Sequence, residues 1–308
     1  MTDAPVTGSR IDEAQTAEAR SLWGDVWRQF RAHKGGVAGA VIFFAIVLMI
    51  VVGPYFHDID PQFLDIRSKN QGPSFKHPMG TDNLGRDMFA QVLAGGRISL
   101  AVGVTAMLLS LFLGTLIGVL AGFIKWLDGP LMRFTDLFLA LPLLPLLLVI
   151  IMLFRDTLRN LFGPETGIFL LIVFVIGITS WMQTARIVRG DVLAVKEQEF
   201  VLAARSIGTR QQRIISRHIL PNVLSPIMVS ATLGIANAII TESALSFLGL
   251  GFPSDFPTWG RLLYDGVNFI AITPERVIWP GLAISLSVLS VNFVGDGLRD
   301  ALDPRLRS

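Results

Sequence analysis

The chain has no cysteine among its 308 residues. This absence excludes disulfide bonds, thiolate metal sites and a cysteine nucleophile, and it leaves the redox compartment open. Charge is also scarce, because Asp, Glu, Lys and Arg make up 16% of the chain, against about a quarter in a typical soluble domain. The formal net charge of +2 gives no sign of a nucleic-acid partner, and we expect none. With 52% hydrophobic residues, the composition indicates a membrane protein.

Motifs for catalysis and for ATP binding are also missing. The four histidines, His33, His57, His77 and His218, are scattered and form no HExxH, so no metal site is expected. The chain has no GxxxxGK[ST] phosphate-binding loop, so any ATP must bind to another polypeptide. We therefore expect a chain that is not an enzyme and that holds no cofactor of its own.

Long apolar runs dominate what is present. Six of them reach or approach the roughly 20 residues needed to cross a bilayer, at 37–56, 98–124, 134–154, 167–184, 223–248 and 277–298. The first run is interpreted as an anchor rather than a signal peptide, because 36 residues precede it and no small-residue cleavage site follows it. The pattern predicts an all-α polytopic membrane protein with about six transmembrane helices.

Positive charge is distributed unevenly between the segments outside these runs. With the N-terminus in the cytoplasm, 17 of the 26 Lys and Arg residues lie on the cytoplasmic side and 9 on the other. Such an excess marks the cytoplasmic side of a membrane protein, so both termini are predicted to be cytoplasmic. The predicted order is a cytoplasmic segment at 1–36, a first span at 37–56, an extracytoplasmic loop at 57–97, a transmembrane core at 98–298 with a cytoplasmic loop at 185–222, and a cytoplasmic tail at 299–308.

An apolar stripe precedes the first span. The segment LWGDVWRQF at 22–30 carries apolar residues at helical spacing, at Leu22, Trp23, Val26, Trp27 and Phe30. The stripe fits an amphipathic helix among lipid headgroups, and it fits equally an extension of the first span. Membrane lipid is an expected partner in both interpretations.

Small residues and prolines interrupt two of the spans. Glycines 114, 118 and 122 form a ridge that favours close helix packing over a hinge. Pro142 and Pro145 predict a kink in the third span.

Three polar residues inside the spans are candidates for a transport pathway. Asn237, Glu242 and Asn292 are costly to expose to lipid and should face the bundle or water. The alternative role is hydrogen bonding between helices. Glu242 also precedes the SFLGLG turn and could hold it from inside.

A basic, helix-patterned cassette at 199–222 separates two apolar runs. Gly208 can end its first helix in a left-handed turn, and Pro221 is expected to end a second helix over about 209–220. The cassette fits a surface loop held to anionic lipid by its arginines, or a helix that inserts into a groove on a partner. One face of the first helix carries small and apolar residues, at Phe200, Ala203, Ala204 and Ile207.

The cassette resembles the EAA loop of importer-type ABC permeases. LAARSIG followed by HILP matches that pattern through Ala203, Ala204 and Gly208, and Leu220–Pro221 closes it. Two positions depart, because Leu202 replaces the glutamate of the motif and His218 replaces an isoleucine.

Further segments resemble the peptide/nickel-type subfamily in particular. They are HPMGTDNLGRDMFAQVLAGGRISLAVG at 77–103, RHILPN at 217–222, ESALSFLGLG at 242–251 and GDGLRDALDPRLR at 295–307. The chain is therefore similar to the C-type permease of a dipeptide/oligopeptide ABC importer of the prokaryotic plasma (inner) membrane.

The resemblance implies a type I ABC importer permease fold and a set of partners. These are a second homologous permease, two cytoplasmic ATP-binding subunits that hold ATP and Mg, and an extracytoplasmic substrate-binding protein. The residues implied to couple to the ATPase are Glu199, Phe200, Ala203, Ala204, Arg205, Gly208, Leu220 and Pro221. Two alternatives from other classes are an ion-driven secondary transporter, which is expected to show internal repeats, and a non-transporting membrane scaffold.

Overall fold

The computed structural model describes residues 22–302, which are helical apart from the loops that connect the helices. The expectations for residues 1–21 and 303–308, and for the side chains of Leu22 and Trp23, lie outside this description. The helices are α1 (Leu22–Ala32), α2 (Lys34–Phe56), α3 (Met88–Phe123), α4 (Lys125–Ala140), α5 (Leu143–Phe162), α6 (Pro164–Val195), α7 (Glu199–Ser206), α8 (Gln211–Ile214), α9 (Leu224–Phe247), α10 (Trp259–Val267) and α11 (Glu275–Leu302). Three short segments complete them, η1 (Ile66–Ser68), η2 (Ile215–Ile219) and η3 (Leu220–Val223).

Five helical stretches are long and apolar enough to cross a bilayer. They are α2, α3, α6, α11 and the continuous run at 211–247 that ends with α9. The pair α4 and α5, bent by 87° at its break, is long and apolar enough to count as a sixth span when it is taken as one unit. The predicted all-α architecture with about six spans is therefore confirmed.

The third span is not the single helix predicted at 134–154. The chain breaks between α4 and α5, where Leu141 adopts an extended conformation with ψ of 138°. Pro142 causes this break, because its ring disfavours a helical conformation in the preceding residue and it has no N–H to donate. Pro145 lies in the first turn of α5, where a missing N–H does not cost a helical hydrogen bond.

Two helices extend beyond the apolar runs that predicted them. α3 begins at Met88 instead of near 98, and α6 continues to Val195 instead of ending near 184. Residues 88–97 and 185–195 therefore belong to helices and not to the predicted loops. Apolarity marks only the part of a helix that suits lipid, whereas backbone hydrogen bonds and caps decide where it ends.

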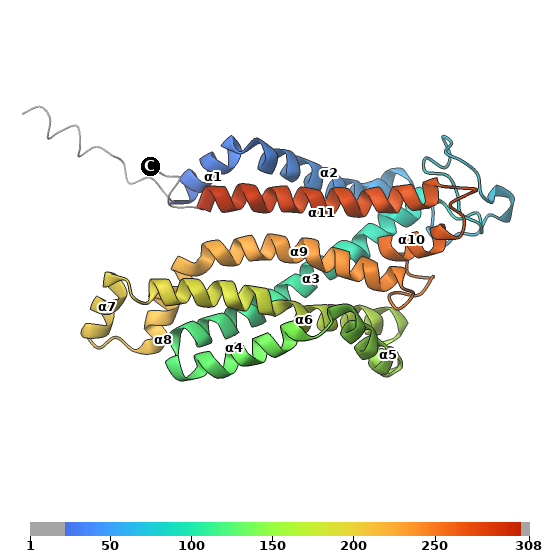
Figure 1. Cartoon of the computed structure of the whole chain (residues 1–308). Coiled ribbons are helices and arrows are strands. Elements are labelled where there is room, and N and C mark those ends of the chain that lie inside the picture. The colour runs from blue at the N-terminus through green and yellow to red at the C-terminus, as the bar shows by residue number, and fades with distance from the viewer. Residues whose placement is uncertain (1–21, 303–308) are drawn as a thin grey trace, which may run out of the picture.

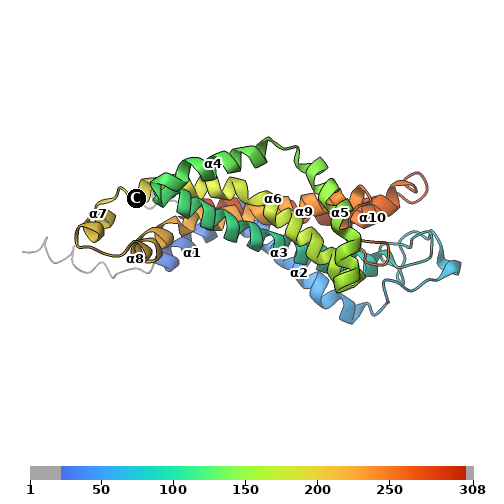
Figure 2. The same ribbon diagram turned by 90° about the horizontal axis from the view of Figure 1, so that it is seen from below.

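The long helices run side by side, and the two ends of the bundle differ (Figure 1). α7, α8, the start of α1 and the end of α11 lie at one end, which we call the α7 end. The loop at 57–87 and α10 lie at the other, which we call the α10 end, and the perpendicular view in Figure 2 agrees. The first and last described residues thus share one end, as an even number of spans requires.

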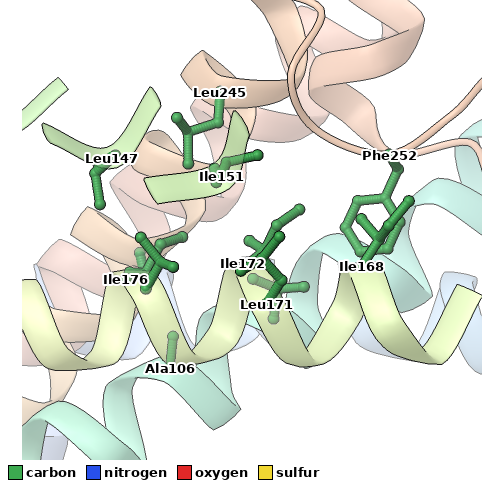
Figure 3. Packing of buried hydrophobic residues seen from close by; sticks show 12 residues of the cluster. Ala106, Leu147, Ile151, Ile168, Leu171, Ile172, Ile176, Leu245 and Phe252 are labelled. Atoms are coloured by element: carbon green, nitrogen blue, oxygen red, sulfur yellow. The ribbon is translucent and has the colours of Figure 1, made fainter. Parts of the chain in front are cut away.

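The main hydrophobic core surrounds α6. Figure 3 shows Ile168, Ile172 and Ile176 of α6 packed among residues of α3, α5 and α9 and the loop after α9. Leu147 and Ile151 of α5 belong to the same cluster, and Phe138 of α4 packs against Trp181 of α6, so both helices of the bent pair are attached to α6. α6 is the central helix of the bundle.

The glycine ridge of α3 lies directly against α6. A Cβ on Gly114 would come within 2.6 Å of the Thr184 side chain, and one on Gly122 within 2.7 Å of Val192. Only glycine permits this backbone approach, and α3 continues unbroken through the ridge. The predicted role in close packing is confirmed.

α1 is a separate helix rather than an extension of the first span. His33 interrupts the chain between α1 and α2, and its Nδ1 accepts a hydrogen bond from the Gly36 N–H at 2.8 Å. Val26 is buried against Ala301 and Leu302 at the end of α11. α1 therefore packs on the bundle with one face and leaves Trp27 exposed.

Candidate functional site

A helical projection stands at the α7 end, formed by residues 196–223. α7 ends in a turn at Gly208, whose φ of +76° lies in the left-handed region. The Thr209 N–H donates to the Ala204 carbonyl at 3.1 Å, which closes the turn. This geometry confirms the predicted glycine turn, since residues with a Cβ rarely adopt it.

The inner side of the projection is apolar and fully packed. Val201, Ala204, Ile214, Ile219 and Val223 are buried in one cluster, and this cluster also contains residues of α3 and α6. The contacted residues of the bundle are Val119, Val188 and Val192. The projection is thus attached to α3 and α6 as one packed unit.

The outer side of α7 is an exposed apolar ridge. Phe200 is 44% exposed and Ile207 is 83% exposed, and Ala203 between them is exposed as well. Positions three and seven residues after Phe200 share its side of a helix, so the three side chains line up. We call Phe200, Ala203 and Ile207 the outer ridge.

Ala204 of the cassette does not lie as expected. Ala204 was placed on the same face as Phe200, yet it is buried beside Val201, because that valine turns this side of α7 toward the bundle. Arg205 lies with its guanidinium 5.9 Å from the centre of the Phe123 ring at the end of α3. The spacing of apolar residues defines a face, but it does not show which side the bundle covers.

The expected helix end at Pro221 is wrong. Residues 211–247 stay helical, and the chain passes through a wide π-turn at Ile215–Ile219 and a tight turn at Leu220–Val223. The change of pitch accommodates a proline, which cannot donate the regular hydrogen bond. The Asn222 side chain donates to the His218 carbonyl at 2.6 Å, so this oxygen keeps a partner.

A groove opens on the side of the bundle between α3, α4, α6 and α9. Its volume is about 580 Å³. Its polar lining includes Thr179, Ser180 and Gln183 from α6, and Asn237 and Thr241 from α9. The groove walls are therefore built from the same α3 and α6 that hold the projection.

The three polar residues predicted inside spans occupy different environments. Asn237 lines the groove, whereas Asn292 lies half-buried on α11 outside it. Glu242 is 0% exposed, and its carboxylate accepts hydrogen bonds from Ser246 at 2.7 Å and Ser99 at 3.1 Å. Glu242 joins α9 to α3 and, through Ser99, to the Trp259 N–H at the start of α10. This position fits the alternative role for Glu242, which is hydrogen bonding between helices.

Comparison with known proteins identifies the family. The chain is 38% identical over 291 residues to the dipeptide transport system permease protein DppC of Alkalihalophilus pseudofirmus, covering 94% of this chain and 92% of that protein. It is 38% identical over 296 residues to the oligopeptide transport system permease protein OppC of Bacillus subtilis, covering 96% and 93%. It is 37% identical over 291 residues to the glutathione transport system permease protein GsiD of Pectobacterium atrosepticum, covering 94% and 93%.

Two family profiles match as well. One is described as binding-protein-dependent transport system inner membrane component and matches residues 114–308. The other, the N-terminal TM domain of oligopeptide transport permease C, matches residues 21–73. The chain belongs to the inner membrane permease family of binding-protein-dependent transport systems. It is a C-type peptide ABC permease with the type I permease fold.

Membership in this family decides between the three classes of membrane protein that the sequence left open, namely an ABC importer permease, an ion-driven secondary transporter and a non-transporting scaffold. The permease is a multi-pass inner membrane component of an ABC importer, and ATP hydrolysis belongs to separate subunits. ATPase and binding-protein partners follow from the same membership. The comparisons support neither the ion-driven carrier nor the scaffold.

The loop at the α10 end of the permease contains a polar cluster that sequence reasoning missed. The buried carboxylate of Asp87 lies 2.7 Å from His77 Nδ1 and 3.1 Å from His57 Nε2. It also accepts the Ala90 N–H at 2.6 Å and so caps α3. The sequence shows an Asp just before an apolar run, which signals a cap, but nothing in it pairs the two histidines. Within residues 22–302, no group of three or more acidic or histidine side chains is arranged to hold a metal ion.

A second carboxylate supports the same loop. Asp82 accepts hydrogen bonds from Arg86 Nε at 2.6 Å and from the backbone N–H groups of Leu84 and Arg86 at 2.8 Å. Nearer the tip, the Ser68 hydroxyl donates to Asp65 at 2.8 Å. This hydrogen bond, with help from the Arg67 N–H, holds the pKa of Asp65 below its ordinary value. The loop is folded by directional polar contacts.

Proposed function

We propose that this permease forms half of a peptide-import pathway, in which the groove conducts the substrate and α7 receives the force of ATP hydrolysis. The observation that carries the proposal is the continuity between the two. The outer ridge of α7 is backed by Val201 and Ala204, and these pack against Val188 and Val192 of the groove-wall helix α6. A push on the ridge is therefore transmitted to the wall of the groove.

The proposed substrate class is di- and oligopeptides. The three relatives are named for transport of dipeptides, oligopeptides and glutathione, and each of these molecules contains amide bonds. A groove of about 580 Å³ lies within the range of small-molecule sites. A second, homologous permease would close the open side of the groove.

Coupling is proposed to begin at two cytoplasmic ATPase subunits, which bind ATP and Mg²⁺. One of them receives the outer ridge in a cleft, with Glu199 and Arg205 at its margins. Closure of the ATPases then moves α7 as a lever whose turn is set by Gly208. The Leu220–Pro221 segment continues directly into α9, so both α6 and α9 follow.

The α7 end and both termini are proposed to be cytoplasmic, and the loop at 57–87 extracytoplasmic. The distribution of Lys and Arg supports this orientation. Exposed apolar side chains gather on the loop, at Phe63, Leu64, Ile66 and Phe75. Such a concentration of exposed apolar side chains is typical of a contact surface, and we assign it to the substrate-binding protein.

Single-cysteine labelling tests the orientation without background, because the chain contains no cysteine. Phe75→Cys should react with a membrane-impermeant maleimide in intact spheroplasts, and Arg210→Cys, at the α7 end outside the outer ridge, should react only in inverted vesicles. Both positions are exposed, which makes them a matched pair. The opposite pattern would reverse the proposed topology.

Purification in a gentle detergent tests the partners. The wild-type permease should bring a second permease and the ATPase subunits with it. Phe200→Asp puts a charge on the outer ridge and should lose the ATPase subunits but keep the second permease. Leu248→Asp makes the same change at an exposed position of the α10 end and should keep both. Recovery of the wild-type chain without any ATPase would overturn the proposed function.

A further inference from the structure

The groove carries two side-chain carboxamides and no charged side chain among the described residues that line it. Gln183 comes from α6 and Asn237 from α9, and both side chains are exposed to the groove. The other polar lining groups are serine and threonine hydroxyls. A pathway with this lining offers hydrogen bonds but no fixed charge.

Two of the threonine hydroxyls in the groove are already committed to their own helices. Thr179 Oγ1 donates to the Val175 carbonyl at 2.7 Å, and Thr241 Oγ1 donates to the Asn237 carbonyl at 2.7 Å. Neither hydroxyl hydrogen is then available to a ligand. The two carboxamides differ, because in the part of the chain that the structure describes neither is held by another residue. Each offers both an N–H₂ donor and a carbonyl acceptor to the groove, whereas a hydroxyl has a single O–H to donate.

The contacts of α3 give the separation of the two carboxamides along the groove. Gly103 faces Ile239, and Met107 faces Gly234, so Asn237 lies beside about residue 105 of α3.

On the α6 side, Leu109 faces Gly177 and Gly114 faces Thr184, so Gln183 lies beside about residue 113 of α3. The two levels differ by about eight residues, or roughly 12 Å at 1.5 Å per residue. α3 runs from the α10 end to the α7 end. A substrate entering from the α10 end therefore meets Asn237 first and Gln183 second.

We propose that Asn237 and Gln183 are two successive hydrogen-bonding stations for the backbone peptide groups of the substrate. This inference rests on the proposed function and names how the pathway recognises its substrate class. A carboxamide presents the same donor and acceptor pair as a peptide bond, so it recognises any peptide whatever its side chains. The absence of charge from the lining keeps the charged peptide termini from being trapped in transit.

The distance between Asn237 and Gln183 predicts how peptides of different length contact them. An extended chain covers about 3.3–3.6 Å per residue, so a tetrapeptide can contact both stations at once. A dipeptide is too short for this and must contact them one after the other. The two stations therefore serve peptides of both lengths. Short peptides bind to them in turn, and longer peptides bind to both at once.

The test measures import of dialanine and tetraalanine by the complete transporter in proteoliposomes, with its partner subunits and binding protein. Asn237→Leu and Gln183→Met nearly preserve side-chain size and remove the carboxamide. Each should slow import of both probes by about threefold to tenfold, the usual cost of one lost hydrogen bond. Binding of the probes to the binding protein should not change. Asn237→Gln and Gln183→Asn keep the carboxamide and should restore much of the rate, while Leu286→Met, at an exposed position of α11 outside the groove, should match wild type.

Failure of this inference is distinguishable from failure of the proposed function. If the wild-type transporter imports neither probe, the peptide assignment falls, and the stations fall with it. If it imports them and both carboxamide variants do so at the wild-type rate, the stations alone are refuted. A second measurement uses only the wild-type transporter, so its result does not depend on whether the variants assemble. A tetraalanine analogue with its central amide replaced by an ester should be imported more slowly, after correction for its binding-protein affinity, and an equal rate would contradict the proposal.

Discussion

The two ends of the permease are held to the bundle in opposite ways. At the α7 end, the projection rests on aliphatic side chains, with Val201 and Ala204 packed among valines of α3 and α6. At the α10 end, the loop at 57–87 is tied by the carboxylates of Asp82 and Asp87 to arginine, histidine and backbone N–H groups. The first attachment is mainly apolar and the second is mainly polar.

The difference fits what each end has to do. Apolar packing has no preferred direction, so packed helices can pivot on one another while they stay in contact. Hydrogen bonds weaken steeply when their angle changes, so a loop held by several of them keeps one position. The apolar attachment suits the lever that we propose for α7, and the polar attachment suits a platform of fixed position at the start of α3.

Gly208→Pro is the substitution with the largest expected effect, because it breaks the lever and leaves the platform untouched. Proline fixes φ near −65°, whereas the turn after α7 requires +76°. Peptide uptake should be abolished, although the amount of permease in the membrane stays close to wild type. Gly190→Ala is the matched control, since a Cβ there meets nothing within 4 Å and its φ is ordinary. Normal uptake by Gly208→Pro would sink the assignment of α7 as the coupling element.

Asp87→Ala breaks the platform instead of the lever. It removes the cap of α3 and leaves His57 and His77 without their carboxylate. The expected loss of stability is about 2–3 kcal/mol, the sum of a cap and a buried polar contact. The unfolding midpoint in detergent measures it, with Asp60→Ala at the exposed start of the loop as a control that should change little. Equal shifts for the two variants would contradict the role of Asp87.

The smallest expected effect is a dependence of the loop on acid. Asp65 has its pKa held below the ordinary 3.8 by the Ser68 hydroxyl and the Arg67 N–H. A lowered pKa means that the contact stabilises the loop above pH 3.8 and loses its effect as the pH falls through the lower, folded value. Amide exchange at Arg67 and Ser68, corrected for the intrinsic rate, should therefore speed up only below about pH 4. In Asp65→Asn this step should vanish, and a step that persists would assign the titration to another group.

Features that depend on neighbours in the chain were predictable from the sequence. The apolar runs located the spans, Pro142 located the break in the third passage, and Gly208 located the left-handed turn. Helix ends were predicted less well, since α3 and α6 continue past their apolar runs. Local backbone preferences act over a few residues, and these can be identified from the sequence alone.

Contacts between distant parts of the chain were not predictable in this way. Ser99 and Glu242 are 143 positions apart, and His57 and Asp87 are 30 apart. The burial of Ala204 instead of its exposure also depends on where α3 and α6 lie. Each of these outcomes depends on how the helices pack against one another. The residue pattern of a single helix does not contain this information.

The sequence by itself determined that this protein is a polytopic helical membrane protein with a helical cassette and a glycine turn at Gly208, because hydrophobicity, proline and glycine act locally. The tertiary structure alone decided which side of α7 faces outward, which polar residue lines the groove and which one is locked inside the bundle. Asn237 and Glu242 are five residues apart on the same helix, yet one lies in the groove and the other has no exposed surface. The packing of α9 against α3 and α6 makes that difference.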